Sequence, residues 1–203
     1  MMAENYMLKE TLSYPSLIRE VIAPLRAQAQ SVLSDEIIRN IDCIYIYGSG
    51  DSLNAAVCAA QSFWEYAGVP AYPLNAMQAS RYAAPCLDRT RAARTLTICI
   101  SNSGETAEMK ATVQAIRRNG CKIIGVTGNR SSWLANFADT HLFAGVPEEG
   151  GPLNRAPRNS ILAEMLVLQA LSVVLQERRA LTPQEYVLRH PGGALGALRE
   201  GEK

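Results

Sequence analysis

The sequence contains little that would support a metal centre or a disulfide framework. Only two histidines occur among the 203 residues, and the five cysteines are odd in number, scattered and without a Cys-x-x-Cys pair. We therefore expect no metal and no cofactor, and a reducing cytoplasmic location. The N-terminal segment lacks the apolar core and the small-residue cleavage site of a secretory signal.

An excess of charge of either sign is also missing. Lys and Arg number 20 against 19 Asp and Glu, a net charge of +1. Without a basic surface, neither nucleic acid nor an anionic membrane is expected as a partner. The longest apolar stretch, 161–175, is interrupted by Glu164 and Gln169. We interpret it as too short to cross a bilayer.

What the chain does have is apolar residues, 48% of the total, enough for one substantial core. We expect one domain over 1–203, with an N-terminal helical segment at about 1–40, a core at about 41–180 and a tail at 181–203. Short β-branched runs predict strands at 43–47, 69–74, 95–100, 122–126 and 140–144. Pro70 and Pro73 favour an edge position for the second of these.

Stretches of helical period separate these runs and predict helices at 16–33, 52–67, 106–118, 131–138 and 160–178. Strands that alternate with helices specify parallel strands joined by right-handed crossovers. The expected fold is a doubly wound, three-layer α/β/α sandwich around a parallel sheet of about five strands. The helix at 160–178 is apolar nearly all round, which indicates burial on most sides or an oligomer interface.

Two loops rich in serine and glycine follow predicted strands, where ligands bind in open α/β sheets. The first, "GSGDS", holds Ser49, Gly50 and Ser52. It lacks the third glycine of a dinucleotide fingerprint and the Gly-Lys-Ser/Thr of a P-loop. The second, "SNSGET", spans 101–106 and opens the helix at 106–118.

The second loop has two interpretations. Asn102 followed three residues later by Glu105 is a helix-capping pattern. Alternatively, the Ser101, Ser103 and Thr106 hydroxyls around Gly104 suit a phosphate dianion, held by neutral donors and by the helix dipole. A second Ser/Gly turn at the same sheet edge strengthens the phosphate interpretation, and the two interpretations are compatible, because the helix start that needs capping is also where a phosphate would bind.

The motif "SNSGET" together with "VTGN" at 126–129 resembles the phosphate loop of the SIS (sugar isomerase) domain family, and the likeness extends over about 40–196. "GGPLNRAP" (150–157) and "HPGGALG" (190–196) resemble D-arabinose-5-phosphate isomerases. "YMLKETLSYPSLI" (6–18), "GSGDS" and "QASRY" (78–82) are more similar to the isomerase half of glucosamine-6-phosphate synthase. The resemblance implies a phosphosugar aldose–ketose isomerase that acts through an enediol, as a dimer or tetramer.

Candidate catalytic residues follow from this resemblance. Such an isomerase needs a base to move a proton between adjacent carbons and an acid–base group to open the sugar ring. The resemblance places the base at Glu65 or at Glu149, and both remain open. It places the ring-opening histidine at His190, which in the family reaches into a neighbouring subunit's site.

Three further residues are candidate substrate contacts: Asp51, Arg81 and Arg158. Here the chain departs from the arabinose-phosphate enzymes. Asp51 stands where they carry a lysine, Gln78 and Arg81 stand where they carry a glutamate and a histidine, and Arg158 replaces part of a threonine-rich segment. These departures leave open the alternative of a non-catalytic phosphosugar-binding or sensing protein.

Overall fold

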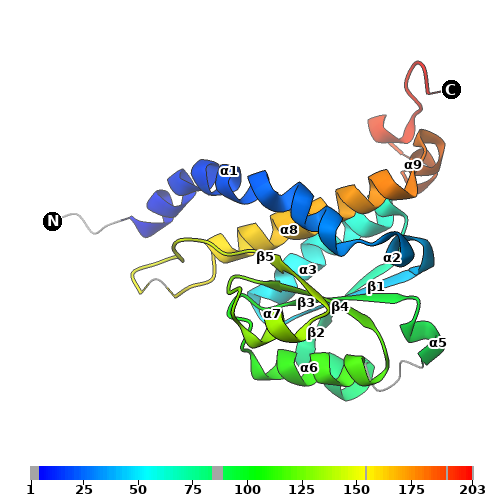
Figure 1. Cartoon of the computed structure of the whole chain (residues 1–203). Coiled ribbons are helices and arrows are strands. Elements are labelled where there is room, and N and C mark those ends of the chain that lie inside the picture. The colour runs from blue at the N-terminus through cyan, green and yellow to red at the C-terminus, as the bar shows by residue number, and fades with distance from the viewer. Residues whose placement is uncertain (1–4, 84–88, 154, 191, 203) are drawn as a thin grey trace.

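A parallel β-sheet forms the centre of the protein. The computed structural model describes residues 5–83, 89–153, 155–190 and 192–202. Five strands pair in parallel in the order β2-β1-β3-β4-β5 (Figure 1). Their bounds are β1 (Cys43–Gly48), β2 (Ala71–Asn75), β3 (Thr95–Ile100), β4 (Lys122–Thr127) and β5 (Thr140–Phe143). The expected five-stranded parallel sheet is confirmed, and β2 lies at its edge.

Helices cover both faces of the sheet. They are α1 (Tyr6–Val32), α2 (Asp35–Asn40), α3 (Asp51–Ser62), α4 (Ala76–Gln78), α5 (Arg89–Ala92), α6 (Ala107–Arg118), α7 (Trp133–Phe137), α8 (Asn159–Arg179) and α9 (Pro183–Arg189). Two π-helical turns, η1 (Phe63–Ala67) and η2 (Ala79–Ala83), and a 3-10 turn, η3 (Ala194–Gly196), complete the described elements. α1, α3 and α8 lie on one face, and α6 and α7 lie on the other (Figure 1). The three-layer α/β/α sandwich is therefore confirmed.

The central strands β1, β3 and β4 are largely buried, because helices cover both faces of the sheet there. On one face Ile46, Ile98 and Val126 are 0% exposed and pack under α1, α3 and α8. On the other, Tyr47 and Cys99 pack against residues of α6 and α7. The sheet is thus held rigidly between two hydrophobic layers, which gives the loops at its carboxyl edge a firm base.

α8 is longer than its most apolar part suggested. It runs for 21 residues, because residues 176–179 continue the helix beyond Leu175. Among the described residues it is the one helix long and apolar enough to cross a membrane, so the expectation that this segment is too short is wrong on length. Of its most apolar window, 56% is buried inside the fold, against α1, α3 and the sheet.

Several helix boundaries differ from those expected. α1 begins at Tyr6, ten residues before the predicted start, and it contains both Pro15 and Pro24. Asn5 fixes that beginning, because its side chain accepts a hydrogen bond from the Leu8 amide. The predicted helix 52–67 is α-helical only to Ser62 and then widens into η1. The C-terminal segment, expected as a tail, forms α9 and η3.

Candidate functional site

The site lies at the point in the sheet where the order of successive strands changes from one side to the other. β1 and β3 are neighbours, but β1 continues through α3 to β2 on one side, and β3 continues through α6 to β4 on the other. The two connections diverge and leave a crevice at the carboxyl ends of β1 and β3, the usual ligand position in such sheets. The loops 48–51 and 101–106 meet there, which are the two Ser/Gly loops singled out in the sequence.

The first loop is a tight turn that brings the start of α3 against the end of β1. A Cβ on Gly48 would lie 2.7 Å from backbone atoms of Ser52 and Leu53, so only glycine fits. Gly50 occupies the N-cap position with φ 56°, and no side chain caps α3 there. The first amides of α3 therefore remain available to an anion.

The second loop is held by a dense set of hydrogen bonds. Ser101 Oγ lies 2.9 Å from Thr106 Oγ1 and accepts from the Gly104 amide at 3.1 Å. The Asn102 carbonyl accepts from the Gly128 amide and from Thr127 Oγ1 on the neighbouring strand connection. The loop is therefore ordered before any ligand arrives.

The capping interpretation of this loop is wrong. No side chain caps α6 at Thr106. Glu105 instead accepts from the Trp133 amide at 2.7 Å and pairs with Lys110, so it caps α7 rather than its own helix. Its pKa lies below the usual range, first because Lys110 donates a hydrogen bond to it. Like α3, α6 leaves its first amides uncapped by side chains.

Both loops line one cavity of about 250 Å³. Its walls are the side chains and backbone of Ser49, Ser52, Ser101, Asn102, Ser103 and Thr106, with Ile100 and Met109 beneath them. None of these lining residues is charged, so the donors are hydroxyls, one amide and helix N-termini. We call this cavity the serine cradle. The structure thus brings together the side chains predicted to hold phosphate.

Glu149 lies beside the serine cradle. Its carboxylate accepts from Asn102 Nδ2 at 3.0 Å and from the Arg158 and Ser160 amides at 3.1 and 3.3 Å. An adjoining hollow of about 220 Å³ is lined by Asn102 and Glu149 together with Gly128, Asn129 and 146–148. Asn102 therefore connects the loop of the cradle to this carboxylate.

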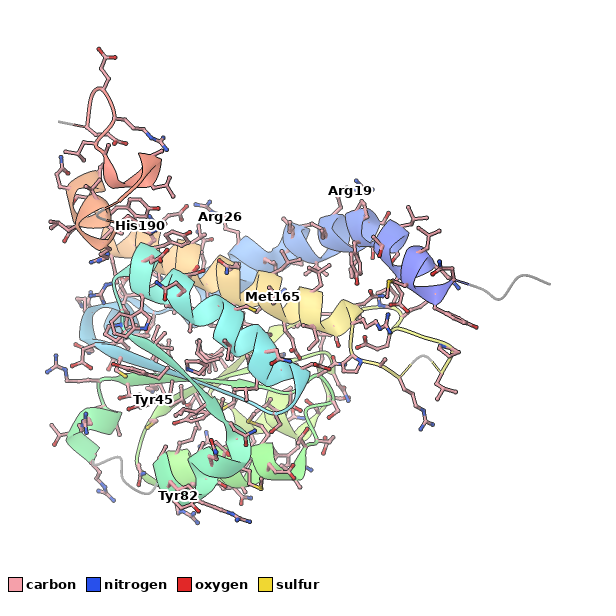
Figure 2. All side chains as sticks on the ribbon, turned by 180° about the vertical axis from the view of Figure 1, so that it is seen from behind. Arg19, Arg26, Tyr45, Tyr82, Met165 and His190 are labelled. Carbon is pink, nitrogen blue, oxygen red and sulfur yellow. The ribbon has the colours of Figure 1, made fainter. Side chains whose placement is uncertain are left out.

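Glu65 and His190 lie together, but at the opposite end of α3. His190 Nε2 is 3.3 Å from Glu65 Oε2, and the imidazole stacks on Tyr186 with ring centroids 4.8 Å apart. At 1.5 Å per residue, the 13 residues from Ser52 to Glu65 correspond to roughly 20 Å. Within one chain, this pair is too far from the cradle to share a substrate with it. Figure 2 places His190 at the end of the molecule occupied by α9.

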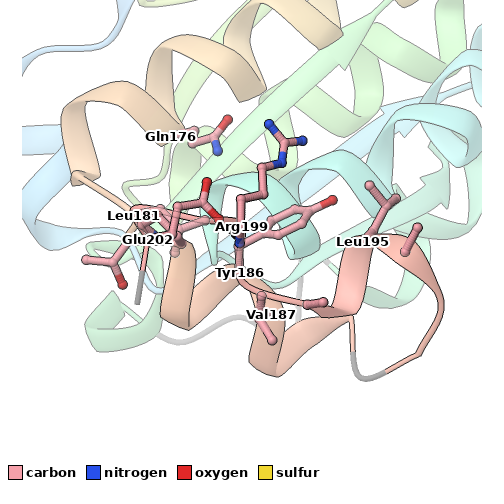
Figure 3. A pocket seen from close by; sticks show the side chains of 11 residues that line it. Gln176, Leu181, Tyr186, Val187, Leu195, Arg199 and Glu202 are labelled. Carbon is pink, nitrogen blue, oxygen red and sulfur yellow. Dashed lines mark hydrogen bonds between the residues drawn. The ribbon is translucent and has the colours of Figure 1, made fainter.

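α9 holds His190 in place. Thr182 and Glu185 form a reciprocal capping box at its start, and Arg189 donates to the Glu65 carbonyl at 3.3 Å. A hollow of about 270 Å³ lies between α9, η3 and the end of α8 (Figure 3). Tyr186 lines this hollow while its ring stacks on His190.

The remaining candidates lie outside the cradle. Arg158 forms an ion pair with the nearly buried Glu10 at 2.9 Å, which ties the start of α8 to α1 and occupies its guanidinium. Arg81 is exposed on η2. Asp51 is exposed at the first position of α3, where its carboxylate accepts from Asn54 Nδ2. The expectation that Asp51, Arg81 and Arg158 contact the substrate remains a prediction.

Glu164 was missed as a site residue. It is 0% exposed on α8, and Ser52 of the cradle donates to its Oε1 at 3.1 Å. Burial, the main cause, raises its pKa to about 8, and the charges of Glu149 and Asp51 act in the same direction. A carboxyl in the middle of an apolar helix was the available signal, although in the sequence it stands out only as an interruption of an apolar run.

Several curated relatives of this chain carry the name arabinose 5-phosphate isomerase KdsD. The chain is 42% identical over 99 residues to the arabinose 5-phosphate isomerase KdsD of Salmonella typhi, which covers 49% of this chain and 30% of that protein. It is 29% identical over 177 residues to the enzyme of the same name from Yersinia pestis, covering 84% of this chain and 52% of that protein. The chain thus spans about half or less of these curated relatives.

A solved structure covers nearly the whole chain. It is the c3406 protein of E. coli CFT073 in complex with a phosphosugar, with 26% identity and a TM-score of 0.76, covering 93% of this chain and 100% of that one. The model of the SIS domain matches residues 37–174, which include both Ser/Gly loops, Glu149 and most of α8. The chain belongs to the SIS domain family.

Proposed function

We propose that the protein is a phosphosugar aldose–ketose isomerase similar to the arabinose 5-phosphate isomerases. The observation that carries the proposal is the serine cradle, where two uncapped helix N-termini converge on one cavity lined by hydroxyls. Helix N-termini favour anions, and neutral hydroxyl donors match the oxygens of a phosphate dianion. Ser49, Ser52, Ser101, Ser103 and Thr106 hold the phosphate, with the amides that follow Gly50 and Gly104.

Glu149 is the proposed base. A sugar anchored by its phosphate in the cradle extends along Asn102 toward the adjoining hollow, where the Glu149 carboxylate lies. Glu149 takes the proton from the carbon next to the carbonyl of the open-chain sugar and leaves an enediolate. The hydroxyl proton of the enediolate moves from the C2 oxygen to the C1 oxygen, and Glu149 returns the carbon-bound proton to the former carbonyl carbon, so that an aldose and a ketose interconvert with no net gain or loss of protons.

His190 is the proposed ring-opening group, and it acts in the site of a neighbouring subunit. The separation of roughly 20 Å along α3 excludes its action on the cradle of its own chain. Glu65 would enter the same neighbouring site together with His190, because Glu65 Oε2 lies 3.3 Å from His190 Nε2. In this scheme Glu65 orients the imidazole, and the homo-oligomer assembles each site from the cradle of one chain and the His190 end of another.

Proton exchange tests the reaction. We expect incubation in D₂O with a panel of aldose and ketose phosphates to remove the C2 proton signal of one of the aldoses or a C1 proton signal of one of the ketoses. Ser103→Ala should mainly raise KM, while Glu149→Gln should abolish exchange and retain phosphosugar binding. Unchanged exchange in Glu149→Gln would contradict its role as the base.

The alternative is a non-catalytic phosphosugar sensor. Asp51 favours it, because an exposed carboxylate at the start of α3 stands where the arabinose-phosphate enzymes carry a lysine. A sensor would be stabilised thermally by a sugar phosphate, since binding to the folded state alone raises apparent stability. It would exchange no C2 proton with any member of the panel.

A further inference from the structure

Behind the serine cradle lies a carboxyl group that has no function in the proposed reaction. Glu164 is fully buried in the second turn of α8, and only one of its two oxygens has a partner among the described residues. Oε2 is buried without a hydrogen bond, as is Ser160 Oγ, four residues earlier on the same face of the helix. A buried polar group that lacks a partner costs folding free energy and calls for an explanation.

The surroundings of Glu164 oppose its negative charge. The charges that act on the pKa of its carboxyl group are those of Glu149 in the loop before α8 and Asp51 at the start of α3, and both raise it. β1 and β3 contribute no charged side chain. From α1, Glu10 is already paired with Arg158.

The other elements packed against α8 supply no cation to Glu164. η1 carries Glu65, which is paired with His190. α2 contacts the far end of α8, where Asp35 pairs with Arg178. No ion pair reaches Glu164 among the described residues, so its neutral form is the one that this environment favours.

The protonation state of Glu164 decides what Ser52 can offer to the cradle. A serine hydroxyl has one proton to donate. When Glu164 is ionised, Ser52 donates that proton to Oε1 and turns a lone pair toward the cavity. When Glu164 is a neutral acid, its own O–H can donate to Ser52 Oγ, and the serine proton is free to face the cavity. The separation of 3.1 Å between the two oxygens serves a hydrogen bond in either direction.

We propose that Glu164 is a positioning residue that acts as a neutral acid, directing the Ser52 hydroxyl toward the phosphate group of the ligand. The relay runs from the Glu164 O–H to Ser52 Oγ, and from the Ser52 O–H to a phosphate oxygen. Loss of the Glu164 proton reverses the direction of the hydrogen bond between Glu164 and Ser52, and it adds a negative charge behind the cradle. The inference rests on the proposed role of the cradle as a phosphate site, and it concerns any phosphate monoester bound there.

The sign of the pH dependence follows from this relay. A ligand that prefers neutral Glu164 raises the pKa of that group when it binds. The affinity for the ligand is therefore highest below the pKa of Glu164 in the free protein, about 8, and it falls as the pH rises through that value. The second ionisation of a phosphate monoester, near pH 6, is complete before this range begins.

Calorimetry with a ligand that cannot isomerise tests the inference. Arabinitol 5-phosphate has no carbonyl group, and glycerol 3-phosphate, also a phosphate monoester, serves as the second probe. We expect the affinity of the unmodified protein to fall roughly tenfold between pH 7.5 and 9.5. Glu164→Gln carries a permanently neutral donor, so its affinity should stay constant over this range. The exposed Glu108→Gln, on the first turn of α6, is the matched control and should keep the fall.

Proton uptake supplies a readout that a merely structural role would not change. At pH 8.5, binding to the unmodified protein should take up a fraction of a proton, measured in buffers of different ionisation enthalpy, and binding to Glu164→Gln should take up none. Equal uptake by the two proteins, or pH-independent affinity in the unmodified one, would overturn the role of Glu164 and leave the cradle intact. Failure of both probes to bind at pH 7.5 would overturn the cradle and this inference together.

Discussion

Gly104 is the residue on which the shape of the second Ser/Gly loop depends most directly. Its φ of 67° lies in the region that glycine adopts without strain. Its carbonyl accepts from the Leu134 amide, which ties the loop to α7. A Cβ at this position would overlap Ser132 Oγ and lie 2.8 Å from Thr127 Oγ1. Backbone conformation and close packing therefore both require glycine here.

Replacing this glycine tests the requirement. We expect Gly104→Ala to lower the free energy of unfolding by about 3 kcal/mol and to abolish phosphate binding, since strain and overlap add. Gly120→Ala is the matched control, because Gly120 has φ 85° but a Cβ there would meet no atom within 4 Å. It should cost about 1 kcal/mol and leave binding unchanged. Urea unfolding and calorimetry measure both, and equal costs would refute the packing argument.

At the scale of elements, α9 and η1 act together. The π-helical turn sets Glu65 at the end of α3, and Gly68 with φ 67° terminates it. α9 packs against this turn through the stacked rings of Tyr66 and Tyr186, whose centroids are 6.1 Å apart. The orientation of His190 therefore depends on an element that contributes no buried residue to the core.

Removing the aromatic contact should separate turnover from binding. Tyr186→Ala takes away the ring that stacks on both Tyr66 and His190, so we expect kcat to fall at least about tenfold with little change in phosphate affinity. Leu188→Ala, at a position 80% exposed on the same helix, should leave both unchanged. A loss of phosphate affinity in Tyr186→Ala would contradict the separation of the two ends of α3.

The sequence predicts an element well when residues of the same segment determine it, and poorly when contacts with distant segments do. The strands and the helices of the core repeat apolar residues at a regular period, so their order and most of their bounds could be predicted. The partners of Glu105 and Glu65 could not, because contacts between distant segments direct the first to α7 and the second to His190. The two Ser/Gly loops were predictable because each directly follows a buried strand.

At the scale of the whole molecule, the proposed site is divided between chains. The cradle and Glu149 contact the first two turns of α8 through Ser52 and the Ser160 amide. α9, which His190 follows, comes after the carboxyl end of α8 (Figure 1). The cradle and His190 lie at opposite ends of α3, roughly 20 Å apart. The half-buried Leu162 and Leu166 and the exposed Val173 leave part of α8 uncovered, which favours contact with a second copy.

Complementation between inactive variants tests this division. Glu149→Gln damages the cradle side and His190→Ala damages the tail side, so each alone should be inactive. In a mixed dimer, one of the two sites combines the intact halves, and random assortment should restore roughly a quarter of the sites. Mass spectrometry establishes that mixed oligomers form. Their formation without any return of turnover would place the whole site within one chain.

The length of α8 has a consequence for how activity depends on protein concentration. If the site is divided as proposed, a single chain carries half of one site at each end of this helix, and the two halves of the same chain cannot meet. Dissociation would therefore stop turnover without unfolding the protein or emptying the phosphate cradle. Dilution in an assay would then separate two quantities that usually fall together, the fraction of protein that binds ligand and the fraction that converts it.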